Sequence, residues 1–378
     1  MPPVQPWEKP GGAIMLAALA LPGLALGADA PDSASISIKY LDYRDSQPNL
    51  DRVHVASPAL ELMVPIAGEW SVRAGVLSDA VSGASPRYHT AVSGASHFRD
   101  RRNSVDAEVT RYLPRATVSL AAGQSDENDY RSRHAALQAS VSSADNNTTW
   151  LAGIGAARDR INPVNKAVTD EEKHTVDLML GVTQVLTPAD IVQAVVTTVR
   201  GRGYFSNPYK YVDNRPRERD QHSALLRWNH HHAASGATTR LGMRHADSSD
   251  GVRSHMLQAD YVWPLSRAWT LTPSTRAYTQ SAADFYFDPV YDKRFGPPFP
   301  PGFVFGAQSF MSADQRLSAF GALTLALKIE RQVGRATTVD LKFERYEQKA
   351  KWRQFGSGSP GLQDFSARTI QAGITHLW

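Results

Sequence analysis

Residues 317–330 read LSAFGALTLALKIE, and this stretch decides the fold class. Apolar residues occupy every second position from Leu317 to Ile329, and the positions between them end in Lys328 and Glu330. Since successive side chains of a strand point to opposite faces, this period of two predicts a long strand with one apolar and one mixed face. An amphipathic helix would require an apolar period of about 3.6 residues.

The same alternation recurs after residue 34, and we identify no amphipathic helix there. These segments are bounded by turn-forming residues and predict about sixteen strands. Their expected spans are roughly 35–43, 51–64, 70–78, 104–112, 116–124, 132–141, 148–157, 172–184, 190–203, 219–231, 237–247, 252–264, 268–281, 313–332, 336–349 and 364–378.

The connections between the predicted strands differ in length by parity. Short turns follow the even strands, at 67–69, 113–115, 144–147, 187–189, 234–236, 266–267 and 334–335. Longer loops follow most odd strands, at 79–103, 125–131, 158–171, 204–218, 282–312 and 350–363, with exceptions at 44–50 and 248–251. This asymmetry is typical of outer-membrane barrels. The sequence therefore predicts an all-β fold, a transmembrane antiparallel up-and-down β-barrel of about sixteen strands.

The composition excludes several other classes of protein. The chain has 378 residues, 42% of them hydrophobic, a net charge of +4 and no cysteine. Without cysteine, disulfide scaffolds, Cys-ligated metals and thiol nucleophiles are excluded. The mean hydropathy of -0.36 fits alternating barrel strands but not a polytopic helical membrane protein. The mild basic excess suits outer-membrane lipid and lipopolysaccharide or an anionic solute, and we expect no nucleic-acid partner.

An apolar run near the N-terminus is typical of an export signal. Residues 13–26 read AIMLAALALPGLAL, which is too short to span about 30 Å of hydrocarbon comfortably. Small residues follow and predict cleavage after Gly27 or Ala30. The alternative, an amphipathic or core helix, lacks the polar face it would need. We predict a signal peptide at 1–30, a single barrel domain at 31–378 and a location in a Gram-negative outer membrane.

Aromatic residues lie near the predicted strand ends, as in the interfacial girdle of a membrane barrel. They are Tyr40, Trp70, Tyr112, Trp150, Trp228, Tyr261, Trp263, Trp269, Tyr346 and Trp378. The last strand ends on Trp378, which resembles the C-terminal aromatic signal of outer-membrane barrels. We therefore expect the barrel assembly machinery as a partner.

If the alternating apolar set faces lipid, the opposite set lines the lumen. Its charged members are Lys39, Asp106, Glu108, Asp177, Arg227, Arg240, Arg244, Arg253, Lys328, Asp340, Lys342 and Glu344. A barrel of about sixteen strands is wide enough for an aqueous channel unless a loop plugs it. These charges either select among solutes or only solvate the wall and pair across strands, and the sequence leaves both interpretations open.

Three long loops are rich in aromatic residues, proline and arginine, unlike disordered linkers. They contain VSGASPRYHTAVSGAS (81–96), YFSNPYKYVDNRPRE (204–218), and DFYFDPVYD (284–292) followed by GPPFPPGF (296–303). We predict a ligand-binding rim or an inward-folded constriction, and the alternative is loops that pack on one another to cap the barrel. The candidate binding residues are Arg87, Tyr88, His89, Tyr204, Tyr209, Arg215, Arg217, Tyr286, Asp288 and Tyr291.

Other chemistry finds little support, and we predict no metal, no cofactor and no catalytic residues. The run His230–His232 lies at a strand end, where neighbouring side chains point to opposite faces, so at most two imidazoles converge easily. Ser85, His89 and Asp100 are of the types that a hydrolase needs, but spacing alone does not assemble a catalytic set.

Longer motifs carry a resemblance to a known family. They include YLDYRDSQPNLDR (40–52), DRINPVN (159–165), RGRGYFSNPYK (200–210), FYFDPVYD (285–292) and ADQRLSAFGA (313–322). Over nearly the whole mature chain, the sequence resembles a bacterial family of exported proteins of unknown function that look like Gram-negative outer-membrane β-barrels. The resemblance carries over no activity. Its members are often encoded beside a small lipoprotein, a thioredoxin-like protein and a flavin transferase, which implies a periplasmic redox or lipoprotein partner.

We therefore expect a non-enzymatic channel or solute-selective pore with structured extracellular loops. One rival hypothesis is a scaffold or conduit for an extracytoplasmic redox or metal-handling partner. Another is a surface barrel enzyme that acts on lipid or peptide. Bilayer conductance, crosslinking in cells and the spatial arrangement of Ser, His and acidic residues on the loops would separate the three.

Overall fold

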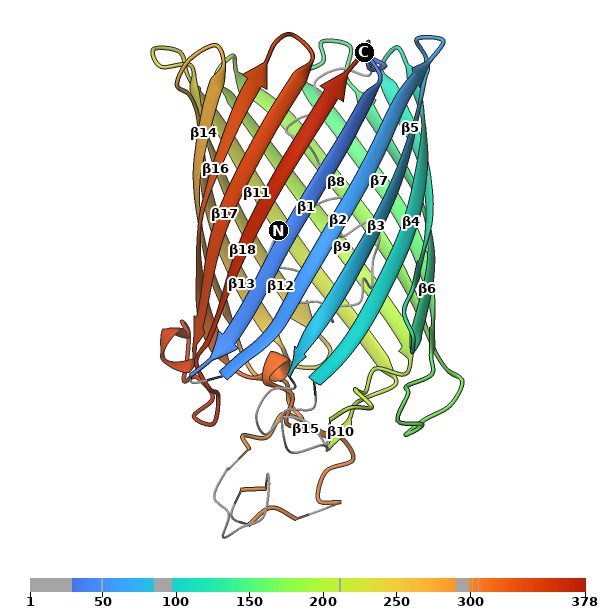
Figure 1. Cartoon of the computed structure of the whole chain (residues 1–378), viewed down its shortest axis with the longest axis vertical. Helices are drawn as coiled ribbons and strands as arrows, with labels where there is room; N and C mark the ends of the chain where they lie inside the picture. The colour runs from blue at the N-terminus through green and yellow to red at the C-terminus, as the bar shows by residue number, and fades with distance from the viewer. Residues whose placement is uncertain are drawn as a thin grey trace.

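The computed structural model describes residues 29–48, 50–84, 97–210, 212–289, 299–300, 302–304 and 306–378. Within these residues, sixteen antiparallel strands close into one barrel in the order β1-β18-β17-β16-β14-β13-β12-β11-β9-β8-β7-β6-β5-β4-β3-β2 (Figure 1). This confirms the predicted fold class. The predicted signal peptide falls almost wholly outside the described residues.

The barrel strands match the sixteen predicted segments. They are β1 (Ser35–Gln47), β2 (Leu50–Ile66), β3 (Trp70–Ala84), β4 (His97–Leu113), β5 (Ala116–Asp126), β6 (Tyr130–Ser142), β7 (Thr148–Ile161), β8 (Glu171–Thr187), β9 (Asp190–Gly203), β11 (Glu218–His232), β12 (Ala237–Ser248), β13 (Arg253–Pro264), β14 (Trp269–Gln280), β16 (Phe320–Val333), β17 (Thr337–Lys349) and β18 (Phe365–Leu377).

Four small elements lie outside the barrel wall. Two-residue strands β10 (Asp213–Asn214) and β15 (Met311–Ser312) pair with each other, and η1 (Gln315–Leu317) and η2 (Ala350–Trp352) are single 3₁₀ turns. In the described part of the chain, no helix has both the length and the apolar character needed to cross a membrane.

The first and last strands complete the ring. Ala34 and Trp378 exchange two backbone hydrogen bonds of 3.1 Å beside the β1–β18 pair. Each barrel strand therefore has two neighbours, and no unpaired strand edge faces lipid. The short turns and the C-terminus lie at one end, at the top of Figure 1, and the long loops lie at the other. We call these the turn end and the loop end.

The outer face of the wall is apolar. On β8, Leu178 and Leu180 are 52% and 61% exposed, whereas Asp177 and Met179 on the opposite face are each 1% exposed. In a closed barrel the exposed apolar face meets lipid and the other face lines the interior. Exposed tryptophans mark the turn end, among them Trp70, Trp150, Trp228, Trp263, Trp269 and Trp378.

Three side chains lie on the face opposite to the one expected. Tyr112 is on the inner face, where it shares a hydrogen bond of 3.0 Å with buried Ser71, and Tyr346 packs against the buried ring of Phe365. Neither tyrosine belongs to an outer girdle. Arg253, expected in the lumen, is on the outer face. It lies four residues before Leu257, which is exposed on the outer face, and residues an even number apart share one face of a strand.

Strand ends differ from prediction mainly at the loop end. β4 begins at His97 rather than 104, and β7 runs to Ile161 rather than 157. Backbone pairing continues there past the apolar belt, where the sequence no longer alternates between apolar and polar residues. The expected strand 313–332 begins only at Phe320, because Asp314 accepts a hydrogen bond from the Arg316 amide and turns the chain away from the wall.

Candidate functional site at the loop end of the lumen

Inward carboxylates lie flat against the barrel wall. Asp177 sits beside Gly155 on the neighbouring strand, and a Cβ atom added to Gly155 would lie 2.8 Å from Asp177 Oδ1. Asp106 covers Gly75 in the same manner, at 2.8 Å. Because glycine leaves room beside the backbone, these carboxylate side chains lie against the wall instead of projecting across the lumen.

The inner wall carries both signs of charge. Lys328 pairs with Glu330 at 2.7 Å, and Lys342 with Glu344 at 2.9 Å, each along one strand face. Asp340 covers Gly373 on β18. The other predicted lumen residues also lie on the inner face of their strands: Lys39, Glu108, Arg227, Arg240 and Arg244. Pairing along the wall accounts for several of these charges without a solute.

Two long loops join each other at the barrel mouth. The segment 204–217 follows β9, and the segment 281–319 follows β14. Strands β10 and β15 pair Asp213 with Ser312, and Asn214 Nδ2 donates a hydrogen bond of 2.8 Å to the Ser309 carbonyl. Ser312 also donates its amide to the Phe285 carbonyl at 2.9 Å. Through these contacts the two loops form one folded unit.

A buried charge cluster lies at the centre of this unit. The Asp314 side chain is fully buried and accepts a hydrogen bond from Arg215 Nη2 at 2.7 Å. Arg316 Nε donates to both carboxylate oxygens of Asp314, at 3.1 and 3.0 Å. Arg215 also donates two hydrogen bonds to the Asp213 carboxylate, of 2.7 and 2.6 Å. We call this cluster the mouth strut, and it comprises Lys210, Asp213, Arg215, Asp314, Gln315 and Arg316.

The strut is fastened to the barrel wall on both sides of the 281–319 loop. Gln280 Nε2, at the end of β14, donates to the carbonyls of Arg316 and Ser318 at 2.9 and 2.8 Å. Gln47 Nε2, at the end of β1, donates to Gln315 Oε1 at 3.3 Å. These contacts place Gln315 and Arg316 of the strut at the level of the strand ends, whereas the β10–β15 pair lies farther out (Figure 1).

The barrel wall beside the strut carries a buried ion pair between Arg52 and Asp45. A register shift after Asp45 leaves Arg52 as an extra residue in β2, and the bulge turns its side chain inward. Arg52 and Asp45 are each 1% exposed, with their charged atoms 3.7 Å apart. The Arg52 guanidinium also lies 5.1 Å from the centre of the Phe365 ring.

The contacts of the mouth strut link segments that leave the barrel on opposite sides. Strand β9 lies eight strands from β1 in either direction around the ring. Sixteen strands about 4.8 Å apart and tilted by about 40° give a circumference near 100 Å, or a diameter of about 32 Å. The path Gln47–Gln315–Asp314–Arg215 therefore connects the end of β1 to the loop that follows β9, which leaves the barrel on the opposite side.

The charged groups of the strut shift one another's pKa values. Burial alone would raise the pKa of Asp314, but Arg316, Lys210 and Arg215 outweigh it and hold that pKa well below its usual range. Burial, reinforced by Arg316 and Arg52, lowers the pKa of Lys210 to about 8 against the attraction of Asp314.

The described candidate binding residues on the loops mostly hold loops together. Tyr209 donates its hydroxyl to Asp129 at 2.6 Å and accepts the Val164 amide at 3.1 Å. Arg217 makes two hydrogen bonds to Glu171, of 2.6 and 2.7 Å, and its guanidinium lies 5.5 Å from the Tyr204 ring.

The third loop contributes one further link. Tyr286 donates its hydroxyl to Asp288 Oδ1 at 3.2 Å, and the Gly361 amide donates to the same oxygen, also at 3.2 Å. Arg87, Tyr88, His89 and Tyr291 lie outside the described residues, as does Ser85.

Sequence reasoning found Arg215 but missed its partners. The alternation places Asp314 in a strand at 313–332, and no sequence pattern marks Lys210, Asp213 or Arg52 as its partners. A usable signal was the segment Asp314-Gln-Arg316, because an aspartate two residues before an arginine fits a capped turn as well as a strand.

Two residues of the histidine run, His230 and His232, lie on the outer face at the turn end. His230 and His232 share one face, with ring centroids 4.6 Å apart, and His230 Nδ1 lies 2.8 Å from Asp190 Oδ1. Trp228 Nε1 donates to the same carboxylate at 3.0 Å. Among the described residues, no group of three or more His, Cys, Asp or Glu is arranged to hold a metal.

The closed sixteen-strand barrel formed by the described residues is the fold of outer-membrane β-barrels. By sequence, the chain belongs to the family described as "Protein of unknown function (DUF3570)", which matches residues 11–170 and 164–369. No curated protein matches the sequence.

Solved structures are similar to the chain in fold alone. A bacterial polysaccharide outer membrane secretin has a TM-score of 0.52 at 8% identity, covering 91% of this chain and 98% of that one. CdiB from Acinetobacter baumannii has a TM-score of 0.50 at 9% identity, covering 89% of this chain, which spans 60% of the CdiB chain. A loop-deletion form of OmpT from Vibrio cholerae has a TM-score of 0.44 at 7% identity, covering 91% and 99% of the two chains.

Proposed function

We propose that the protein is a channel of the Gram-negative outer membrane whose permeation is limited at the loop end by the mouth strut. The observation that carries this proposal is the path Gln47–Gln315–Asp314–Arg215, which joins opposite sides of the opening. A barrel about 32 Å across would otherwise leave a wide mouth. An inward-folded loop narrows the opening and brings charged groups close to a passing solute.

The charge of the strut and the facing wall predicts a weak preference for anions. The cations are Arg52, Lys210, Arg215 and Arg316, and the anions are Asp45, Asp213 and Asp314. Four positive and three negative groups leave a net charge of +1 at the constriction. Because the pairs largely neutralise one another, we expect small solutes of either sign to pass, with chloride favoured over potassium.

Planar-bilayer recording of the purified, folded barrel tests this function. In a KCl gradient the reversal potential should indicate modest anion selectivity. Deletion of 284–303, which removes most of the loop that supports the strut, should raise the single-channel conductance severalfold. A folded barrel that conducts no ions, before and after the deletion, would show that the channel proposal is wrong.

A further inference from the structure

A cluster of arginines lies on the outer surface of β6 and β7, toward the loop end. The register of these strands sets Arg131 directly opposite Arg160, and Arg133 directly opposite Arg158. All four belong to the outward-facing set of their strands and are exposed. We call them the arginine quartet. Like charges placed directly opposite on one sheet face destabilise the pair of strands.

The protein itself compensates only part of this charge. Asp126 on β5 forms an ion pair with Arg131, and Glu172 on β8 lies 2.7 and 3.5 Å from the two arginines of β7. Arg133 donates to the neutral side chain of Gln124, with Nε 2.8 Å from Oε1. Among the described residues, two carboxylates thus pair with four guanidinium groups, and the cluster keeps a net charge of +2.

The height of the quartet matches the headgroup region of a membrane. On the outer face of β7, Trp150 at the turn end is followed by Ala152, Ile154 and Ala156 before Arg158. Eight residues at about 3.3 Å each span about 26 Å along the strand. At a tilt of about 40° this is about 20 Å along the barrel axis, close to the height of an apolar belt. The arginines therefore begin where the hydrocarbon ends.

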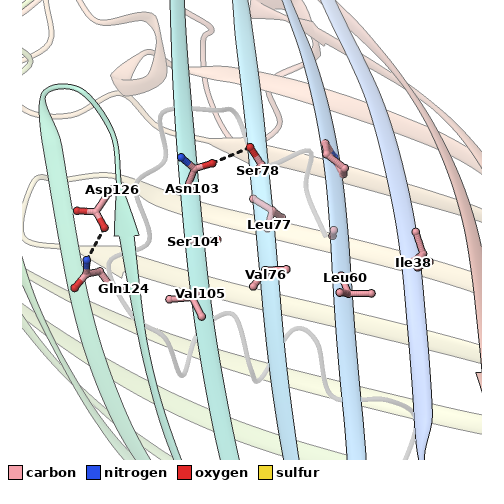
Figure 2. Close-up of a pocket in the computed structure, with 12 residues that line it drawn as sticks. Ile38, Leu60, Val76, Leu77, Ser78, Asn103, Ser104, Val105, Gln124 and Asp126 are labelled. Atoms are coloured by element: carbon pink, nitrogen blue, oxygen red, sulfur yellow. Dashed lines mark hydrogen bonds between the residues drawn. The ribbon is translucent and has the colours of Figure 1, made fainter.

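An apolar groove lies beside the quartet on the outer wall. It is an open concavity of about 640 Å³, formed across β1 to β5 (Figure 2). Its floor includes Ile38, Leu60, Val76 and Val105, and its polar side includes Ser78, Asn103, Gln124 and Asp126.

The groove and the quartet are continuous. Gln124 and Asp126, joined to each other by a hydrogen bond of 2.5 Å, are the same residues that contact Arg133 and Arg131. A ligand with an anionic head on the arginines could therefore lay an apolar chain in the groove.

We propose that the quartet and the groove together bind one phosphorylated, acylated glycolipid of the leaflet at the loop end, such as the lipid A part of lipopolysaccharide. Its phosphate lies among the four guanidinium groups, which present paired N–H donors to phosphate oxygens. An acyl chain occupies the groove on the turn-end side of Asn103, over Leu60 and Val76. The phosphate neutralises the remaining charge of the quartet and removes the repulsion across β6 and β7. This binding site is independent of whether the barrel conducts.

The test compares two double variants of the full-length barrel, folded in a neutral detergent and titrated with lipid A. Arg133→Gln with Arg158→Gln removes one opposed pair of the quartet. Arg200→Gln with Arg202→Gln is the control, because it removes the same charge at a similar height on β9. There each arginine faces a carboxylate instead, since Arg200 and Arg202 pair with Asp220 and Glu218 in register.

We expect the quartet variant to bind lipid A at least tenfold more weakly per arginine lost, about 100-fold in all, because a charge-assisted hydrogen bond contributes at least about one factor of ten. The control should bind within about threefold of the wild type. Without lipid, the quartet variant should unfold at a higher temperature than the wild type, because one of the two opposed arginine pairs is gone.

Three results would overturn the proposal. The first is equal affinity for lipid A and for its dephosphorylated form. The second is equal loss of affinity in the control variant. The third is displacement of lipid A by inorganic phosphate at the same concentration, which would indicate a soluble anion without a role for the apolar groove.

Discussion

Replacement of Asp314 by asparagine is the sharpest test of the mouth strut. The substitution keeps the size of the side chain and removes its charge. In the native protein this fully buried carboxylate is held by Arg215 at 2.7 Å and by Arg316 at 3.0 and 3.1 Å. The variant would leave these two cations, and nearby Lys210, without their shared counter-ion.

The magnitude follows from the burial of the cluster. Removing one partner of a buried ion pair costs about 3–5 kcal/mol, because the remaining charges stay desolvated. The loop 281–319 is docked when Asp314 lies in the strut and undocked when it leaves the mouth. At about 1.4 kcal/mol per factor of ten, the equilibrium between these two states should shift by roughly two to three and a half orders of magnitude. Asp314 is not part of a barrel strand, so the sheet and its melting temperature should change little.

Two measurements report the shift in the equilibrium of the loop. Hydrogen exchange of the Ala283 and Ser312 amides, which donate to Leu317 and Phe285 across the folded loop, should accelerate strongly. In planar bilayers the mean conductance should rise and fluctuate. The matched control is Arg217→Ala, since its pair with Glu171 is largely exposed and is worth under about 1 kcal/mol. Unchanged exchange and conductance in Asp314→Asn, or equal changes in the control, would refute the role assigned to the strut.

Three further predictions concern the mouth, the wall and the lipid face. The pKa of Lys210 is lowered by burial to about 8, from 10.5, so the undocked loop binds more protons between these values. Docking should therefore tighten, and conductance fall, as the pH rises from about 8 to 10.5, and Lys210→Met should abolish this dependence. Gly155→Ala should displace Asp177 from the wall and lower conductance, whereas Gly242→Ala, whose nearest neighbour is 4.0 Å away, should not; equal conductance in both would contradict the packing argument. Leu341→Arg on the lipid face should lower the free energy of unfolding in bilayers by about 2–4 kcal/mol, and urea titration with no such loss would place Leu341 away from lipid.

The barrel could be predicted from the sequence because lipid imposes a period of two on every strand. In the stretch LSAFGALTLALKIE the residues from Phe320 onward follow this rule and form β16. The residues before it follow the same rule by chance, and the chain there forms η1 instead. Alternation records which face meets lipid, so it carries no information beyond the apolar belt, where β4 and β7 run several residues longer than expected.

The candidate site was predictable only in part. The aromatic and arginine content of 204–218 and 284–292 predicts structured loops, and among the described residues of these segments Arg215 is a predicted binding residue that joins the mouth strut. The sequence could not predict the partners of Arg215. Asp314 lies 99 residues away along the chain and contacts Arg215 only after both loops have folded. The inward turn of Arg52 likewise depends on a bulge in the pairing of β1 with β2.

The sequence by itself determined the number of strands, the parity of their connections and, for most residues of the apolar belt, the face that they present. These properties follow from local rules, since strand geometry and the exclusion of unpaired backbone from lipid act on each segment separately. Only the tertiary structure decided which loops cross the mouth, which carboxylates lie flat against glycines and which arginines oppose each other on the outer wall. These features depend on the register of pairing and on contacts between distant segments, because closing the ring brings strands together that no local pattern relates.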